Sequence, residues 1–301
     1  MRQEEQKTPS DTKQQGLVQS IREWWSEHPM SYQGYVRPDL KTDDEYREFF
    51  RKVDEAWWTA TNLTNTANPK YLCDNIISKE EIAGGKVLEI GCGMGTMTEQ
   101  FASWGCDVTA IDLATTSIEM TRKRLELANL TAAVMEMDAG NLRFPNEHFD
   151  FVWSWGVIHH SPHTEEIVRE IHRVMKRGAG FAIMVYYTFS LHSMHVLLRH
   201  GVIGGQLFKY DWQDLQNRWS DGAEHGGVPL ARSWTRKGFR ELLSPLKVSR
   251  VTNHSNRDAA FLFVPTRPLK SLARALVPCA ACDMVTGRFG HCMLACGHKN
   301  E

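Results

Sequence analysis

The sequence Val87-Leu88-Glu89-Ile90-Gly91-Cys92-Gly93-Met94-Gly95 decides the fold of this chain. A short apolar run ends there in three glycines at alternate positions. This pattern predicts a buried strand that turns tightly into a helix. Glycine suits such a turn because it adopts unusual backbone angles and has no Cβ to collide with a ligand. We therefore expect a ligand to lie against this turn.

Two further strand ends carry acids. A second apolar run ends in the carboxylate of Asp112, and a third ends at Asp138-Ala139. An acid at the tip of the second strand can accept hydrogen bonds from both hydroxyls of a ribose. Asp138 can accept from an adenine amine, while the next backbone N–H can donate to a ring nitrogen. The three strand ends together predict a site for an adenosine-containing molecule at one edge of a sheet.

Strand-like and helix-like runs alternate through the middle of the chain. The predicted strands are 86–90, 107–111, 132–137, 149–155 and 180–187, and the predicted helices are 96–104, 115–128 and 164–176. Single helices between consecutive strands imply parallel pairing with right-handed crossovers. The sequence therefore predicts an α/β fold with a doubly wound, mostly parallel sheet. Sheet character returns at 246–252 and 290–297, with a short helix expected over 267–277.

We divide the chain into five predicted segments. These are a flexible tail over 1–19, a helical N-terminal lid over 20–80, a ligand-binding core over 81–187, a substrate cap inserted over 188–245, and the C-terminal part of the core sheet over 246–301. The lid and the cap hold Trp24, Trp25, Trp57, Trp58, Trp212, Trp219 and Trp234, seven of the ten tryptophans. These side chains either pack the two segments against the sheet or form an apolar lid over a substrate chamber.

Composition narrows the class of protein. The formal net charge of -1 gives no reason to expect binding to nucleic acid or to an anionic membrane. No apolar run approaches the roughly 20 residues needed to span a bilayer. The polar start, 1–15, does not resemble a signal peptide with its apolar centre. We therefore expect a cytoplasmic protein without a membrane span or a nucleic-acid partner.

Cysteine usage agrees with that expectation. The seven cysteines are odd in number and include Cys92 in the glycine turn, which argues against a disulfide framework and favours a reducing compartment. The last four, Cys279, Cys282, Cys292 and Cys296, match zinc-site spacing only loosely. The run 290–296 is equally typical of a buried strand that holds small apolar cysteines. We expect no metal.

Several motifs together resemble one known family. They are the glycine turn 87–95, Ile111-Asp112, Asp138-Ala139, Phe149-Asp150-Phe151-Val152, Ile158-His159-His160 and the run Arg169-Glu170-Ile171-His172-Arg173-Val174-Met175-Lys176. In these the chain resembles the class I S-adenosylmethionine-dependent methyltransferases, in the branch of ubiquinone/menaquinone-type and other small-molecule enzymes. The resemblance is firm over about 85–187. The spacing Gly-x-Gly-x-Gly differs from the dinucleotide fingerprint, which disfavours a nicotinamide cofactor. One departure, Lys-Arg-Gly-Ala-Gly at 176–180 in place of Lys-Pro-Gly-Gly, affects loop geometry away from the cofactor.

The resemblance implies a fold, a cofactor and a set of binding residues. The fold is a Rossmann-like sheet of seven strands, whose antiparallel seventh strand is the 290–297 run. The cofactor is S-adenosyl-L-methionine, with the glycines at its methionine part, Asp112 at the ribose, Asp138 and Ala139 at the adenine, and Trp155 or Gly156 near the sulfonium. The cofactor-binding residues expected on this basis are Glu89, Gly91, Cys92, Gly93, Gly95, Asp112, Leu113, Asp138, Ala139 and Trp155.

The implied reaction is in-line displacement of a methyl group to an oxygen or carbon of a small, apolar or cyclic metabolite. With a hydroxyl acceptor a base would increase the rate, and His159 and His160 after the fourth strand are candidates, with His225 of the cap as a third. Each of these histidines can instead be a packing or loop residue. Tyr186 and Tyr187 end the fifth strand, where one can face the substrate or simply pack.

Two other functions stay open at this point. A methyltransferase acting on protein or RNA is one, although Ser154-Trp155-Gly156-Val157 stands where base-amine methyltransferases carry Asn/Asp-Pro-Pro-Phe/Tyr, and the charge lacks a basic footprint. A catalytically inactive cofactor-binding partner or sensor is the other. The sequence also leaves the oligomeric state open, with a homodimer as one alternative.

Overall fold

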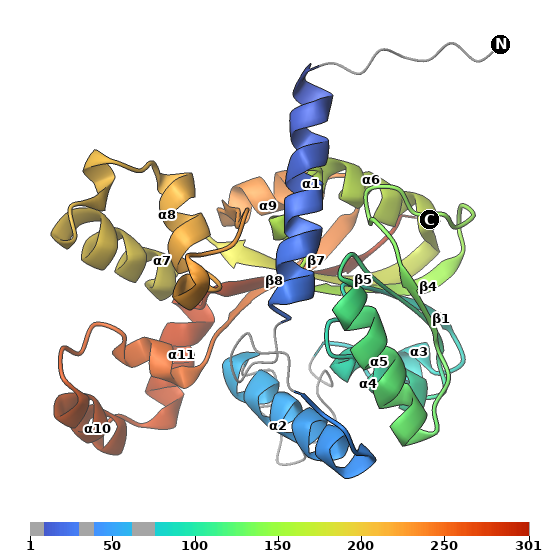
Figure 1. The fold of residues 1–301 in the computed structure, drawn as a ribbon, viewed down its shortest axis with the longest axis horizontal. Helices are drawn as coiled ribbons and strands as arrows, with labels where there is room; N and C mark the ends of the chain where they lie inside the picture. The colour runs from blue at the N-terminus through green and yellow to red at the C-terminus, as the bar shows by residue number, and fades with distance from the viewer. Residues whose placement is uncertain (1–8, 30–38, 62–75, 301) are drawn as a thin grey trace.

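The structure is a computed structural model that describes residues 9–29, 39–61 and 76–300. At its centre lies one sheet of eight strands (Figure 1). The strands are β1 (Lys86–Ile90), β2 (Asp107–Asp112), β3 (Ala133–Glu136), β4 (Phe149–Trp155), β5 (Met175–Tyr187), β6 (Ser233–Trp234), β7 (Lys247–His254) and β8 (Cys292–His298). The predicted α/β class is confirmed.

The strand order is β3-β2-β1-β4-β5-β8-β7, with the two-residue β6 beside β5. The strands β1 to β5 are parallel to one another, whereas β8 runs antiparallel to both β5 and β7. The order reverses between β1 and β4, which is where ligands bind in open α/β sheets. The predicted antiparallel strand near the C-terminus is therefore confirmed, although it begins at Cys292 and not at residue 290.

Helices connect the strands and cover the sheet. The helices of the core are α4 (Thr96–Ser103), α5 (Thr115–Ala128), the 3-10 turn η1 (Ile158–His160), α6 (Thr164–Val174) and α9 (Arg236–Leu242). The N-terminal helices are α1 (Pro9–Glu27), α2 (Asp43–Thr61) and α3 (Lys79–Ile82). The remaining segments are α7 (Leu191–His195), the π-helix η2 (Val196–Ile203), η3 (Gln206–Phe208), α8 (Trp212–Trp219), η4 (Ala223–His225), η5 (Arg257–Phe261), α10 (Arg267–Leu276) and α11 (Cys279–Phe289). Within the described ranges, no helix combines the length and apolarity that a bilayer crossing requires.

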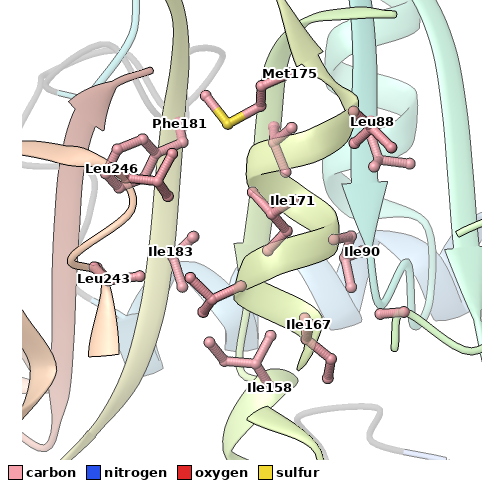
Figure 2. Close-up of a cluster of buried hydrophobic side chains, with 14 of the residues drawn as sticks. Leu88, Ile90, Ile158, Ile167, Ile171, Met175, Phe181, Ile183, Leu243 and Leu246 are labelled. Atoms are coloured by element: carbon pink, nitrogen blue, oxygen red, sulfur yellow. The ribbon is translucent and has the colours of Figure 1, made fainter. Parts of the chain in front are cut away.

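Strand β1 is buried on both faces, because successive side chains point to opposite sides of a sheet. Leu88 and Ile90 point to the face covered by α6, where they belong to one apolar cluster with Ile167 and Ile171 (Figure 2). Val87 points the other way, to a cluster that contains Phe101 of α4. Apolar packing on both sides holds β1, and with it the glycine turn at its end, in a fixed position.

An ion pair and a hydrogen bond hold the N-terminal helix α2 against the core. Arg124 of α5 donates to Asp54 of α2 at 2.6 Å and to Glu99 of α4 at 2.5 Å. Thr96, the first residue of α4, also donates to Asp54 at 2.9 Å. The guanidinium of Arg124 is almost fully buried, and these carboxylates compensate its charge.

Some predicted boundaries are wrong. Helix α1 begins at Pro9, inside the segment predicted as a tail, because a single mid-helix Gly16 does not stop a helix. Helix α6 ends at Val174, since Met175 has an extended backbone and pairs with Phe149 as the start of β5. Helix α11 was not predicted, because its apolar residues are spread over more than one side, with Cys282 buried and Met284 exposed. The lid and cap assignments stay predictions, and 1–8, 30–38 and 62–75, with Cys73, lie outside the described residues.

Candidate active site

The glycine turn after β1 uses its three glycines in different ways. All have positive φ angles, +80° at Gly91, +52° at Gly93 and +76° at Gly95, which side chains disfavour. A Cβ at Gly91 would lie 2.0 Å from Cγ2 of Val157, and one at Gly95 would lie 3.0 Å from the hydroxyl of Thr121. A Cβ at Gly93 would meet nothing within 4 Å. Gly91 and Gly95 therefore permit close packing, whereas Gly93 faces open space.

That space belongs to a cavity of about 540 Å³ at the carboxyl edge of the parallel strands. Every predicted cofactor-binding residue except Gly95 lines it: Glu89, Gly91, Cys92, Gly93, Asp112, Leu113, Asp138, Ala139 and Trp155. Gly95 is instead the residue before α4, against α5. The structure therefore brings the ends of β1, β2, β3 and β4 to one cavity.

Asp112 joins two of these strand ends. Its Oδ2 accepts a hydrogen bond from the backbone N–H of Gly93 at 3.0 Å, and its Oδ1 accepts from Ala114 at 2.9 Å. Burial raises the pKa of Asp112, and the donating backbone N–H groups oppose that rise. Asp138 accepts in the same way from the N–H of Gly140 at 2.8 Å. Both acids are thus held in place by backbone donors at the cavity wall.

Glu89 is the most strongly perturbed acid of the site. The side chain is 3% exposed, and burial raises its pKa from 4.5 to about 8, with a smaller rise from the charge of Asp112. The hydroxyl of Thr98 on α4 donates a hydrogen bond to Oε2 of Glu89, which opposes the rise in pKa. Glu89 is therefore protonated at neutral pH, and a cationic group entering the cavity would favour its ionised form.

Tryptophans from separate parts of the chain form an apolar wall. Trp155, at the end of β4, lies 5.7 Å from Trp57 of α2 between ring centroids and stacks on Trp153 at 5.9 Å. Trp25 of α1 meets the ring of His160 at 5.0 Å. All five of these side chains line the cavity, so its apolar wall joins α1 and α2 to β4 and η1.

Polar side chains form another part of the cavity lining, which we call the polar wall. It consists of His160, Tyr186, His192, Asp221 and His291, all of which line the cavity. The hydroxyl of Tyr186 donates to Oδ2 of Asp221 at 2.7 Å, and the same oxygen lies 3.7 Å from Nε2 of His160. The ring of His291 stacks on Tyr186 at 4.0 Å. Burial lowers the pKa of each of the three histidines.

The tautomer of His160 follows from its neighbour. Nδ1 lies 2.7 Å from the carbonyl oxygen of Leu230, and a carbonyl can only accept. Nδ1 therefore carries the proton. Because burial lowers the pKa of His160, although Asp221 opposes this, the ring is neutral and Nε2 has a free lone pair. A neutral imidazole of this kind can take a proton.

The other two candidate bases do not line the cavity. His159 is fully buried, with its ring 4.2 Å from that of His160 and 3.9 Å from that of Tyr186. Adjacent residues of a 3-10 helix point about 120° apart, so η1 turns His160 to the cavity and His159 into the protein. His225 lies on η4, with its ring 4.6 Å from that of His28.

Sequence reasoning missed His192, Asp221, His291 and Cys292 as cavity residues. Cys292 pairs with Tyr186, so the start of β8 lies beside the end of β5. An antiparallel strand begins at the edge where its parallel neighbours end, and this rule could have brought His291 to the site. His192 and Asp221 come from a region without periodicity and left no signal. Cys279 and Cys282 lie on α11 and Cys292 and Cys296 on β8, and the expectation of no metal stays a prediction.

Comparisons with known proteins agree with this geometry. Residues 87–178 match the family model described as a methyltransferase domain. A 27-O-demethylrifamycin SV methyltransferase from Amycolatopsis mediterranei is 32% identical over 156 residues, which are 46% of this chain and 55% of the relative. A ubiquinone biosynthesis O-methyltransferase from Glaesserella parasuis is 26% identical over 145 residues, 44% of this chain and 60% of the relative. The chain thus spans less than two thirds of the length of these relatives.

A solved structure supports the fold. The S-adenosylmethionine-dependent methyltransferase from Methanosarcina mazei superposes with a TM-score of 0.50 at 20% identity, over 75% of this chain and 96% of that one. The chain therefore contains a methyltransferase domain, and its fold is the Rossmann-like fold of class I S-adenosylmethionine-dependent methyltransferases. The family resemblance read from the sequence motifs is confirmed.

Proposed function

We propose that the whole protein transfers a methyl group from S-adenosylmethionine to an oxygen or carbon of a small, apolar or cyclic metabolite. One observation carries the proposal. The open side of Gly93 and the carboxylates of Asp112 and Asp138 surround a single cavity of about 540 Å³, a volume typical of small-molecule sites.

The residues present fit the cofactor. The turn at Gly93 has room for a ligand against its backbone, and Glu89 lies beside it for the cationic methionine end. Asp112 would accept hydrogen bonds from the ribose hydroxyls, and Asp138 with Ala139 would bind the adenine. When bound, S-adenosylmethionine supplies a methyl group that is already activated on its sulfonium.

The protein's own contribution is to align the reactants and exclude water. Trp25, Trp57 and Trp155 give the cavity an apolar side that disfavours water. Alignment of two reactants in such a site can lower a barrier by about 7–11 kcal/mol. The two relatives are named as a rifamycin-type and a ubiquinone-pathway methyltransferase, which supports a small-molecule acceptor.

We assign the role of base to His160 for a hydroxyl acceptor. Nδ1 is occupied as a donor to Leu230, which leaves Nε2 to take the acceptor proton. Asp221, 3.7 Å from Nε2, would stabilise the imidazolium that forms. His160→Gln should then lower turnover by roughly 10²- to 10⁴-fold with little change in cofactor affinity. His225→Gln is the matched control outside the cavity and should keep its turnover.

The cofactor assignment is tested by calorimetry. Asp112→Ala should lower affinity for S-adenosylmethionine by more than about ten-fold, since it removes charge-assisted hydrogen bonds, and should keep a native circular dichroism spectrum. Asp107→Ala is the control, because Asp107 is an exposed acid at the other end of β2. Unchanged affinity in Asp112→Ala would refute the assignment of the ribose site.

The acceptor class is tested by transfer of a labelled methyl group into a cell extract. Label in a small molecule supports the proposal. Label in protein or RNA would favour a macromolecular acceptor, and bound cofactor without any transfer would favour an inactive sensor. A cytoplasmic location and a homodimer remain predictions from the sequence.

A further inference from the structure

Exposed apolar side chains are concentrated in two stretches of the chain. In the described part of the protein, every large hydrophobic side chain that is exposed comes from 189–208 or 263–284. They are Phe189, Met194, Leu197, Leu198, Val202, Ile203, Leu207, Phe208, Phe263, Leu269, Leu272, Leu276, Val277 and Met284. We call these residues the apolar end surface. A concentration of this kind marks an interaction site in a folded protein.

The two stretches meet in space. Helices α7 and α8 and helices α10 and α11 lie at one end of the molecule, away from α4 and α5 (Figure 1). The ring of His195 on α7 lies 5.8 Å from that of Phe263, next to η5, and joins the two stretches. The apolar end surface is therefore one region of the molecule.

Helix α10 has its apolar side unpacked. Leu269, Leu272 and Leu276 recur at helical spacing on one side, and Arg267, Lys270 and Arg274 recur on another. None of its ten residues is buried, and Arg274 pairs with Asp258 of η5. The leucines are thus left to solvent, the reverse of a helix that packs on a core.

Charge is distributed unevenly in the same region. The stretches 189–208 and 263–284 contain one acid, Asp283, although the chain has 36 aspartates and glutamates. They contain four basic residues, Arg199, Arg267, Lys270 and Arg274. The net charge of -1, from which we expected no binding to anionic membranes, averages over this local excess of positive charge.

We propose that the apolar end surface docks on a bilayer that contains anionic lipids. A basic amphipathic helix with an exposed leucine side is the form that lies in the headgroup region of a membrane. Lys and Arg beside it add attraction to anionic headgroups. A second copy fits less well, because a twofold contact would bring two surfaces with an excess of basic residues against each other.

The docking surface adjoins the cavity. His192 of α7 lies in the first stretch and lines the cavity, and Ala259 of η5 and Leu262, which directly precede the second stretch, line it as well. A protein docked in this way would therefore hold this side of the cavity close to the lipid. The inference goes beyond the proposed function and does not depend on it.

Flotation of the full chain with vesicles tests the docking. The protein should float with vesicles of phosphatidylglycerol and phosphatidylcholine in equal parts, and less with phosphatidylcholine alone. The double variant Leu272→Gln with Leu276→Gln should lower the partition coefficient by at least about ten-fold. Arg267→Gln with Lys270→Gln should lower it by about five-fold per residue at low salt.

The control variant is Lys237→Gln with Arg240→Gln on α9, which removes two basic residues outside the apolar end surface and should keep full binding. All substituted side chains are exposed or partly exposed, and circular dichroism checks the fold. Failure of the wild type to float would overturn the proposal. The proposal would also be overturned if light scattering showed a dimer that the double leucine variant dissociates, while the protein did not float with vesicles. Calorimetry with S-adenosylmethionine on the same variants separates this outcome from failure of the cofactor site.

Discussion

Replacement of Glu89 by glutamine should remove the loss of stability that this carboxyl causes as the pH rises from about 4.5 to about 8. The carboxyl is 3% exposed, and its pKa is raised from 4.5 to about 8 by burial. The folded protein therefore keeps this proton up to about pH 8, whereas the unfolded chain releases it near pH 4.5. Stability must fall as the pH rises through that interval, because the unfolded state then binds fewer protons than the folded state.

The size of this change in stability follows from the difference between the pKa values of Glu89 in the folded and unfolded states. Each unit of difference in pKa between the folded and unfolded states corresponds to about 1.4 kcal/mol. A rise of the pKa from 4.5 to about 8 therefore corresponds to a decrease in the free energy of unfolding on the order of 5 kcal/mol between pH 4.5 and about pH 8. Glutamine stays neutral and can still accept the hydrogen bond from Thr98. The variant should match the wild type near pH 4.5 and exceed it increasingly toward pH 8.

Urea denaturation followed by tryptophan fluorescence measures the free energy of unfolding at a series of pH values. Glu126→Gln is the control, because its side chain is 67% exposed and exposed substitutions change stability by about 0.5 kcal/mol or less. If the difference between Glu89→Gln and the wild type stayed constant across this pH range, the argument from burial would be wrong.

Three further substitutions test the packing of the site. Gly91→Ala should lower stability by about 1–3 kcal/mol in thermal unfolding, since its Cβ would lie 2.0 Å from Cγ2 of Val157; an unchanged melting temperature would show that the turn adapts. Arg124→Met should lower the free energy of unfolding in urea by about 3–5 kcal/mol, because two carboxylates lose a buried partner, and equal stability would contradict this. Tyr186→Phe removes the hydrogen bond to Asp221 and should lower the free energy of unfolding by about 1–3 kcal/mol in the same assay, and unchanged stability would contradict this.

The cofactor side of the cavity was predictable because its signals are local. Each of these predicted binding residues lies at the end of an apolar run, so a correctly predicted strand also locates the side chain at its end. Gly93, Asp112 and Asp138 line the cavity for this reason. Gly95 was the exception, because a positive φ angle and close packing on Thr121 require glycine without any ligand.

The polar wall was not predictable in the same way. Tyr186, Asp221 and His291 meet only after the sheet forms, and no local pattern connects them. His159 and His160 are neighbours in sequence, and only the geometry of η1 separates the buried ring from the one at the cavity. Tertiary contacts, which a single sequence does not reveal, decide these positions.

The family match ends at residue 178, yet Trp25, Asp221 and His291 complete the cavity from outside it. Under the proposed function, donor recognition and acceptor recognition depend on different stretches of polypeptide. Evolution could exchange the outer stretches and obtain a new acceptor while keeping the same methyl donor. A chimera that joins residues 76–187 to the flanks of a relative would carry that relative's choice of acceptor.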